Sequence, residues 1–291
     1  MGRETNKRRR QRQAATAREK AAAARALQHR AEQRRRAWTI ISGIVALAVV
    51  GVLIAVVAIN SGGSQKNDRV AAQPAIVNGV TSVTPASLQT IGPGTASQSA
   101  KPIHGDPPLT SNGKPELLYI GGEFCPFCAA ERWPMVQALS RFGKFSNLSQ
   151  IRSASTDLNI ATFSFYKSSY TSKYLSFVPV ENEDRNRKPL VNMTSAQAAL
   201  FSKYTGGAYP FLDFGGKYVQ TNDGYDYSLL QGKNWQQIAT ALKDPASPIA
   251  KGILGEANNL TATICKMTNN QPSSVCGAPD ITNLQGKLSG A

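Results

Sequence analysis

Residues 117–133 read Leu-Leu-Tyr-Ile-Gly-Gly-Glu-Phe-Cys-Pro-Phe-Cys-Ala-Ala-Glu-Arg-Trp, and this stretch decides more about the chain than any other. The apolar run at 117–120 is typical of a buried strand, and Cys125 and Cys128 follow it at the start of a helix-like segment. The positive end of a helix dipole stabilises a thiolate, so a thiol pKa there falls from about 8.5 to roughly 3.5–7.5. The second sulfur lies one turn away and can close a disulfide. The motif therefore predicts thiol–disulfide exchange.

Two other interpretations of the motif compete with this one. The two thiols could be half of a zinc site, but the chain offers only His29, His104 and a distant cysteine pair as further ligands. They could also form a static structural disulfide. The placement between a strand and a helix argues against that second interpretation, because a structural bridge does not need a helix N-terminus.

The net charge of +15 is concentrated at the N-terminus. Residues 1–36 hold 13 Lys and Arg against three Glu, whereas residues 37–291 hold 20 against 15 Asp and Glu. A basic tail of this kind is compatible with attraction to anionic lipid or with nucleic-acid binding. We expect it to act mainly as a topology signal.

The tail is followed by an uncharged apolar segment over residues 37–59. A helix of about 20 such residues spans the hydrocarbon core of a bilayer, and the segment is long for a cleaved signal peptide, which is the alternative. Arg34, Arg35 and Arg36 precede it directly. The positive-inside rule then places residues 1–36 in the cytoplasm and the rest outside, in a single-pass membrane protein.

All four cysteines follow the predicted membrane helix, in a compartment where disulfides persist. Because the first two are close together, the favoured pairing of the others is Cys265 with Cys276. That bridge would be a structural staple; a second redox pair that relays electrons to the first is the alternative.

The remainder of the chain divides into three parts. Residues 60–113 are rich in Ser, Gly, Pro and Thr and predict an extracytoplasmic linker. Residues 114–243 predict an α/β domain, with a second strand over 160–166, a polar insertion over about 167–205 that includes a helix at 194–204, and a hairpin after Pro210. Residues 244–291 predict a C-terminal extension that carries the second cysteine pair.

The order strand, Cys-x-x-Cys, helix, strand, isolated Pro, hairpin and helix resembles the thioredoxin-like superfamily. The sequence Gly-Gly-Glu-Phe-Cys-Pro-Phe-Cys-Ala-Ala-Glu-Arg-Trp over 121–133 also resembles a prokaryotic, membrane-anchored, thioredoxin-like family of unassigned function. The resemblance implies a thioredoxin-like α/β fold with an inserted segment, joined to a single N-terminal transmembrane helix.

The resemblance also implies roles for individual residues. Cys125 would be the attacking thiolate and Cys128 the resolving thiol, while Tyr209 and a cis Pro210 would lie beside the sulfurs and contact the substrate. Thioredoxins carry a buried acid six residues before the first cysteine, but here that position is Tyr119. Glu123 and Glu131 are the nearest alternatives for a general base.

These observations lead us to expect a membrane-tethered, extracytoplasmic thiol–disulfide oxidoreductase. Its substrates would be protein thiols and disulfides, with a separate redox partner and with no metal, cofactor or nucleic acid. A thioredoxin-like binding module with structural disulfides and no catalysis is the alternative. Nucleic-acid binding through residues 1–36 is a third hypothesis, and it predicts a steep salt dependence.

Overall fold

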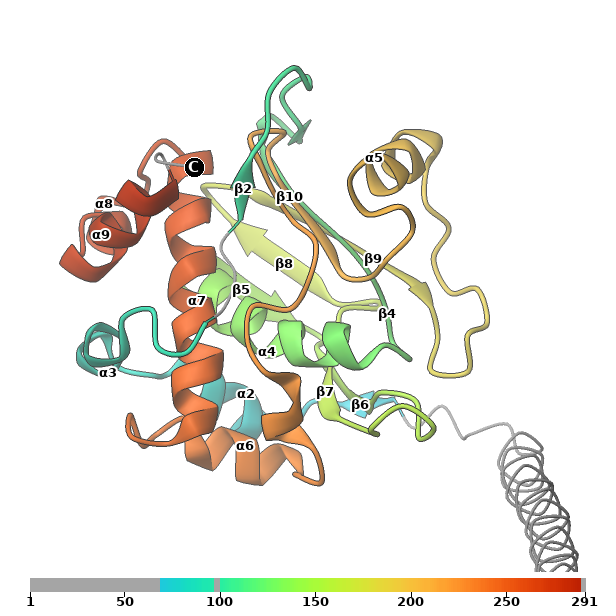
Figure 1. Cartoon of the computed structure of the whole chain (residues 1–291), viewed down its shortest axis with the longest axis vertical. Coiled ribbons are helices and arrows are strands. Elements are labelled where there is room, and N and C mark those ends of the chain that lie inside the picture. The colour runs from blue at the N-terminus through green and yellow to red at the C-terminus, as the bar shows by residue number, and fades with distance from the viewer. Residues whose placement is uncertain (1–68, 97–99, 289–291) are drawn as a thin grey trace, which may run out of the picture. The chain divides into compact units, whose positions relative to one another are not determined.

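The computed structural model describes residues 69–96 and 100–288, a mixed α/β structure. Its central sheet is built around β4 (Lys114–Gly122), which pairs in parallel with β9 (Ser176–Glu183) and antiparallel with β10 (Phe211–Phe214) (Figure 1). The sheet continues from β10 through β11 (Tyr218–Gln220) to β2 (Lys101–Pro102), and β3 (Thr110–Ser111) pairs with the start of β4.

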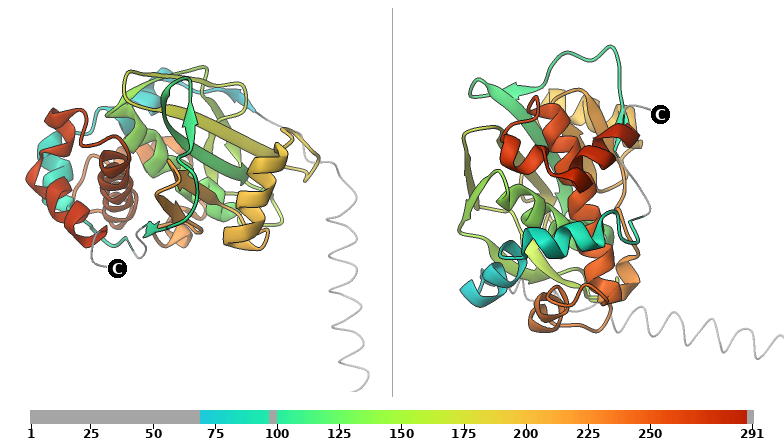
Figure 2. Two further views of the ribbon diagram at one scale, coloured as in Figure 1. Left: turned by 90° about the horizontal axis from the view of Figure 1, so that it is seen from above. Right: turned by 90° about the vertical axis from the view of Figure 1, so that its left-hand side faces the viewer.

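Helices cover both faces of this sheet. One face packs against α4 (Pro126–Ser140) and α7 (Pro248–Met267), and the other packs against α5 (Ser195–Thr205). Figures 1 and 2 show α5 and the C-terminal helices on opposite sides of the sheet. Because β4 is buried on both faces, its run at 117–120 is continuously apolar, with alternate side chains in two different core clusters.

Five further strands in the described part of the chain lie outside the central sheet. They form two small sheets: β6 (Ser149–Arg152) lies between β1 (Val70–Ala71) and β7 (Ala161–Ser164), and β5 (Gly143–Ser146) pairs with β8 (Ser169–Ser172). The remaining helices are α2 (Pro74–Thr81), α3 (Pro85–Ile91), η1 (Tyr227–Leu230), α6 (Trp235–Ala241), α8 (Ser273–Cys276) and α9 (Pro279–Leu288).

The second strand predicted over residues 160–166 is confirmed as β7, but it does not pair with β4. It belongs to a separate sheet, and the parallel neighbour of β4 is β9, which lies within the predicted insertion. The sequence did not predict β9, because this strand is only partly apolar and is flanked by Ser-rich and charged segments. The predicted helix at 194–204 is confirmed as α5, with Thr194 as its N-cap in a capping box.

Parts of the predicted linker and of the predicted extension belong to the folded core. Within 60–113, α2 and α3 bury Ile76, Val80 and Leu88 against the domain, so residues 74–91 are not an extended spacer. Within 244–291, α7 is the longest described helix and packs along α4. In both places a few apolar residues at helical spacing are enough to form a helix, because another surface of the domain covers the apolar face.

The predicted basic tail (1–36) and the predicted membrane helix (37–59) lie outside the described residues. Among the helices that are described, none has the length and the hydropathy that crossing a bilayer requires.

Candidate functional site

The two thiols of the Cys-Pro-Phe-Cys motif lie where β4 passes into α4. Cys125 is the N-cap of the helix, and Pro126 occupies the first helical turn, where its missing N–H costs no hydrogen bond. The backbone N–H of Cys128 donates to Cys125 Sγ at 3.3 Å. The sequence therefore positions the first sulfur at the helix N-terminus, as the spacing predicted.

The two sulfurs differ in their contact with solvent. Both cysteines are free thiols in this structure. Cys128 is fully buried, whereas Cys125 keeps 4% of its surface exposed, and the neighbouring Phe127 keeps 37%. Any partner that reaches the pair therefore meets Cys125 first.

The two thiols also differ in acidity. A hydrogen bond from the Cys128 thiol lowers the pKa of Cys125 against the effect of burial, and backbone N–H groups and Arg132 add to the lowering. Burial raises the pKa of Cys128 well above its ordinary value, and its interaction with Cys125 raises it further. Cys125 is thus the thiol that ionises first, and Cys128 holds the shared proton.

Tyr209 and Pro210 lie beside this pair. The Tyr209–Pro210 peptide bond is cis, as the resemblance implied. Tyr209 packs against the cluster formed by Phe124, Cys125 and Cys128, and its ring meets that of Phe124 edge to face at 5.9 Å. Asn182 Nδ2 donates to the Tyr209 hydroxyl at 2.7 Å, which fixes the ring in place. The structure therefore brings together residues that are more than 80 positions apart in the sequence.

A buried ion pair that no pattern in the sequence indicated lies behind the thiols. Arg132 donates through Nε and Nη2 to the two carboxylate oxygens of Glu181, at 2.9 and 2.6 Å, and both side chains are buried. Nη2 also donates to the carbonyl oxygen of Gly122. Glu181 opens a charged run within the polar insertion that the sequence predicted over about 167–205. Val178 and Val180 precede this run, and their alternating spacing is typical of a strand that continues into it.

Neither candidate general base is free to act as one. Glu123 is buried and accepts two hydrogen bonds from Arg69, at 2.8 and 2.6 Å, and one from Ser164. Glu131 is buried on α4 and faces Glu256 on α7, and Gln220 donates to both carboxyl groups.

The pKa of each of the two carboxyl groups on α4 and α7 is raised above its ordinary value. Burial raises the pKa of Glu256 to about 8, while hydrogen bonds from Gln220 and Asn259 act in the opposite direction. Burial, followed by the charge of Glu256, raises the pKa of Glu131 well above its ordinary value. Among the residues that the structure describes, no three His, Cys, Asp or Glu side chains converge on a metal position.

The second cysteine pair lies elsewhere in the domain. Cys265, near the end of α7, is bonded to Cys276 at the end of α8. Both belong to the core cluster on the α4–α7 face, whereas Cys125 and Cys128 belong to a separate small cluster. The disulfide ties the C-terminal helices to α7.

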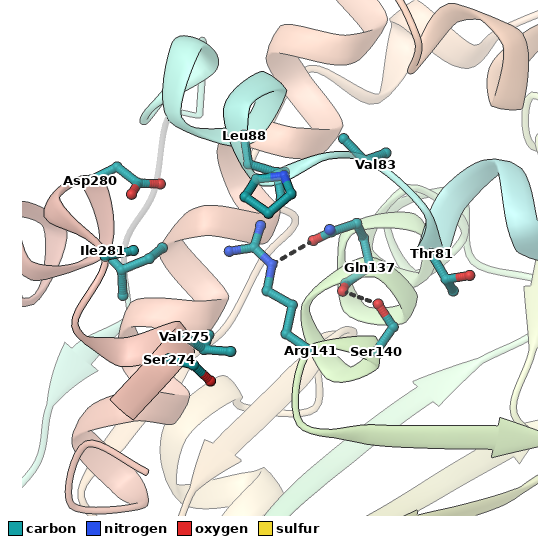
Figure 3. A pocket seen from close by; sticks show the side chains of 12 residues that line it. Thr81, Val83, Leu88, Gln137, Ser140, Arg141, Ser274, Val275, Asp280 and Ile281 are labelled. Atoms are coloured by element: carbon teal, nitrogen blue, oxygen red, sulfur yellow. Dashed lines mark hydrogen bonds between the residues drawn. The ribbon is translucent and has the colours of Figure 1, made fainter. Parts of the chain in front are cut away.

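A cavity of about 230 Å³ lies between α3, the end of α4 and the α8–α9 segment (Figure 3). Arg141 projects into it and donates to Gln137 at 3.2 Å and to Asn258 at 2.7 Å. Burial lowers the pKa of Arg141 to about 10, and Asp280 on the far wall opposes that shift. No cysteine lines this cavity, so it is separate from the thiol site.

No curated protein and no solved structure matches the chain. A protein family matches residues 104–266, which include Cys125, Cys128 and Pro210 and amount to more than half of the 291 residues. On this match the chain belongs to the family described as Domain of unknown function (DUF929).

Proposed function

We propose that this protein is a thioredoxin-like thiol–disulfide oxidoreductase that works through Cys125 and Cys128. The observation that carries the proposal is the asymmetry of the two thiols. Cys125 has the lowered pKa, the helix N-terminus and the remaining solvent contact, while Cys128 is buried and retains the proton. An attacking thiolate and a resolving thiol need these two environments.

The order of elements supports a thioredoxin-like fold. Strand β4, the cysteine pair, α4, Pro210, the β10–β11 hairpin and α6 follow the order that the sequence resemblance implied. The parallel strand beside β4 is β9 and not the strand expected over 160–166. Tyr209 beside the sulfurs supports the same assignment, because the residue before this proline would meet the substrate.

The chemistry balances without a cofactor. When a substrate disulfide R–S–S–R′ is reduced, the Cys125 thiolate attacks one sulfur, the substrate S–S bond breaks, and the released thiolate takes up a proton. Cys128 then attacks Cys125 Sγ and releases the second substrate thiol, and a Cys125–Cys128 disulfide remains. In the reverse direction the same steps oxidise a dithiol.

The cellular placement is part of the proposal. Residues 37–59 would anchor the chain in the membrane, with residues 1–36 in the cytoplasm and the domain outside. The bond between Cys265 and Cys276 supports an extracytoplasmic domain, because disulfides of this kind persist in oxidising compartments. Its partners would be protein thiols and disulfides, together with a redox protein that resets the pair.

One observation favours a second candidate, a thioredoxin-like binding module that does not turn over. Only 4% of the Cys125 surface is exposed, and Arg187 lies over the ring of the adjacent Phe124 at 3.7 Å. In this candidate the exposed Phe127 and its edge-to-face neighbour Tyr227 would contact a partner protein.

Insulin reduction and oxidation of a dithiol peptide by the full chain in detergent decide between the two. The oxidoreductase predicts that Cys125→Ser abolishes turnover and that Cys128→Ser accumulates a mixed disulfide on Cys125. Equal rates for the wild type and Cys125→Ser would instead support the binding module. The reduction potential of the pair then gives the direction, since oxidases lie near about −120 mV and reductases near about −270 mV.

A further inference from the structure

Two buried polar atoms near Cys128 have no hydrogen-bond partner in the part of the chain that the structure describes. They are the hydroxyl oxygen of Tyr119 and Nη1 of Arg132. Both side chains are fully buried, and leaving such groups unpaired costs free energy of folding. An unpaired donor in a protein core calls for a specific explanation.

The arrangement of the two donors is fixed by their neighbours. Arg132 follows Cys128 by four positions on α4, so both side chains project from one face of the helix. Nε and Nη2 of Arg132 are engaged by Glu181 and by the Gly122 carbonyl, which leaves only Nη1 available. The backbone N–H of the same Gly122 faces the Cys128 sulfur.

The Tyr119 hydroxyl reaches the same region from the sheet. It lies directly over Gly121, where an added Cβ would be 2.1 Å from the hydroxyl oxygen, so only glycine leaves room for it. The ring of Tyr119 lies near the guanidinium of Arg132, with 5.9 Å from Cζ to the ring centroid. Burial raises the pKa of Tyr119 well above its ordinary value, so at neutral pH the hydroxyl keeps its proton and is a donor.

The charge of Arg132 acts on the thiols. Burial of Cys128 and its interaction with Cys125 raise the pKa of Cys128, and the guanidinium of Arg132 acts in the opposite direction. Arg132 in turn stays charged because the carboxylate of Glu181 outweighs the effect of its burial. The ionisable groups around Cys128 are therefore Arg132 on its own helix, Cys125 at the N-cap, Tyr119 on β4, Glu181 on β9 and Tyr209 before β10.

We propose that the Tyr119 hydroxyl and Arg132 Nη1 form a buried donor pair that stabilises the Cys128 thiolate during the resolving step. This inference rests on the proposed function and identifies what replaces a buried general base. In the mixed disulfide, the Cys128 thiolate attacks Cys125 Sγ, and the proton that Cys128 gives up is balanced by the one that the departing substrate sulfur gains. The bond between Cys125 and the substrate sulfur breaks, and the departing substrate thiolate takes up one proton. The donor pair neutralises the transient negative charge on Cys128 and accepts no proton itself.

Tyr119→Phe is the main test, because it removes an oxygen that has no partner and leaves the ring in place. We expect resolution of the mixed disulfide to slow by about tenfold or more, the effect of losing one hydrogen bond to a charged group. The thermal stability of the oxidised protein should stay the same or rise. Tyr225→Phe is the matched control: this buried hydroxyl donates to the Ala130 carbonyl on the same helix, so its loss should lower stability and leave resolution unchanged.

A second measurement does not depend on turnover. In full-length Cys125→Ser protein with ¹³Cβ-labelled cysteine, the Cys128 signal is titrated by NMR, while the disulfide-bonded Cys265 and Cys276 serve as references that do not titrate. We expect Tyr119→Phe to raise the pKa of Cys128 in this background, and Tyr225→Phe to leave it unchanged. An unchanged Cys128 titration together with normal resolution would overturn the donor pair while leaving the oxidoreductase proposal intact. If Tyr119→Phe shifts the pKa of Cys128 but the wild-type protein shows no exchange activity, the proposed function is contradicted. The stabilisation of the Cys128 thiolate by the donor pair is then still supported.

Discussion

Arg132 on α4 and Glu181 on β9 form a bidentate ion pair, 49 residues apart in the sequence, in which both side chains are buried. The pair joins the helix that carries the thiols to the strand that runs parallel to β4. It lies directly behind Cys128 and supplies the positive charge that both thiols experience. One contact therefore links the packing of the sheet to the electrostatics of the site.

Glu181→Ala should destabilise the protein by about 3–5 kcal/mol, because it leaves the guanidinium of Arg132 buried without a counter-charge. Urea unfolding monitored by circular dichroism measures this loss. Lys203→Ala is the control, since it removes one partner of a surface ion pair with Asp106 and should change the unfolding midpoint little. Equal effects of the two substitutions would contradict the role assigned to the buried pair.

Glu123→Gln should lower stability without altering the pH dependence of thiol exchange. Glu123 is adjacent to the motif in sequence, but its carboxylate is engaged by Arg69 and Ser164, so it holds β7 and the N-terminal segment together. Stopped-flow measurement of exchange between pH 5 and 9 checks this expectation. A rate that loses its pH dependence in the variant would identify Glu123 as a base after all.

The stability of the protein should fall as the pH rises from about 4.5 to about 8, through the titration of Glu256. Burial raises the folded-state pKa of this group to about 8 from an ordinary value of 4.5, so the folded state binds more protons than the unfolded chain across that window. Proton linkage then makes the free energy of unfolding decrease with increasing pH. The stabilisation that Glu256 contributes through its raised pKa is fully present below the unfolded-state pKa and is lost as the pH rises through the folded-state pKa.

Glu256→Gln tests this linkage by removing the titration while keeping an amide of the same shape. The variant should show a flatter dependence of stability on pH between about 5 and 8, as measured by urea unfolding at a series of pH values. Asp226→Asn is the control, because hydrogen bonds with Ser228 lower the pKa of Asp226 and it titrates below this window. A slope unchanged by Glu256→Gln would show that the group is already ionised at pH 5.

Replacing both Cys265 and Cys276 with serine should cost about 3 kcal/mol of stability, since the bridge closes a loop with a sequence separation of 11. Exchange by Cys125 and Cys128 should continue at the wild-type rate, because the two pairs belong to different clusters of the core. Thermal unfolding and insulin reduction measure the two effects separately. A folded double variant that can no longer be reset by its redox partner would instead support the relay alternative.

The local features of the site could be predicted from the sequence because they depend on neighbours in the chain. A strand, two cysteines spaced by two residues and a proline in the first turn are enough to place Cys125 at a helix N-terminus. The capping box of α5 and the hairpin after Pro210 follow from equally local patterns.

The errors arose where the outcome depends on a distant surface. The Ser-rich segment before α4 contains α2 and α3 because the α4–α7 face was available to cover their apolar side chains. The charged run that begins at Glu181 continues a buried strand because Arg132, far away in the sequence, supplies a counter-charge. No periodicity within either segment carries that information.

The sequence by itself determined the placement of the thiols: the spacing of two cysteines and the helix that follows them fix which sulfur lies at the positive end of a dipole. Only the tertiary structure decided how the second sulfur is surrounded, since Tyr119, Arg132 and Glu181 reach Cys128 from a strand, a helix and a second strand. Burial makes the difference, because it strengthens every interaction among these groups and depends on all the elements that exclude water from them.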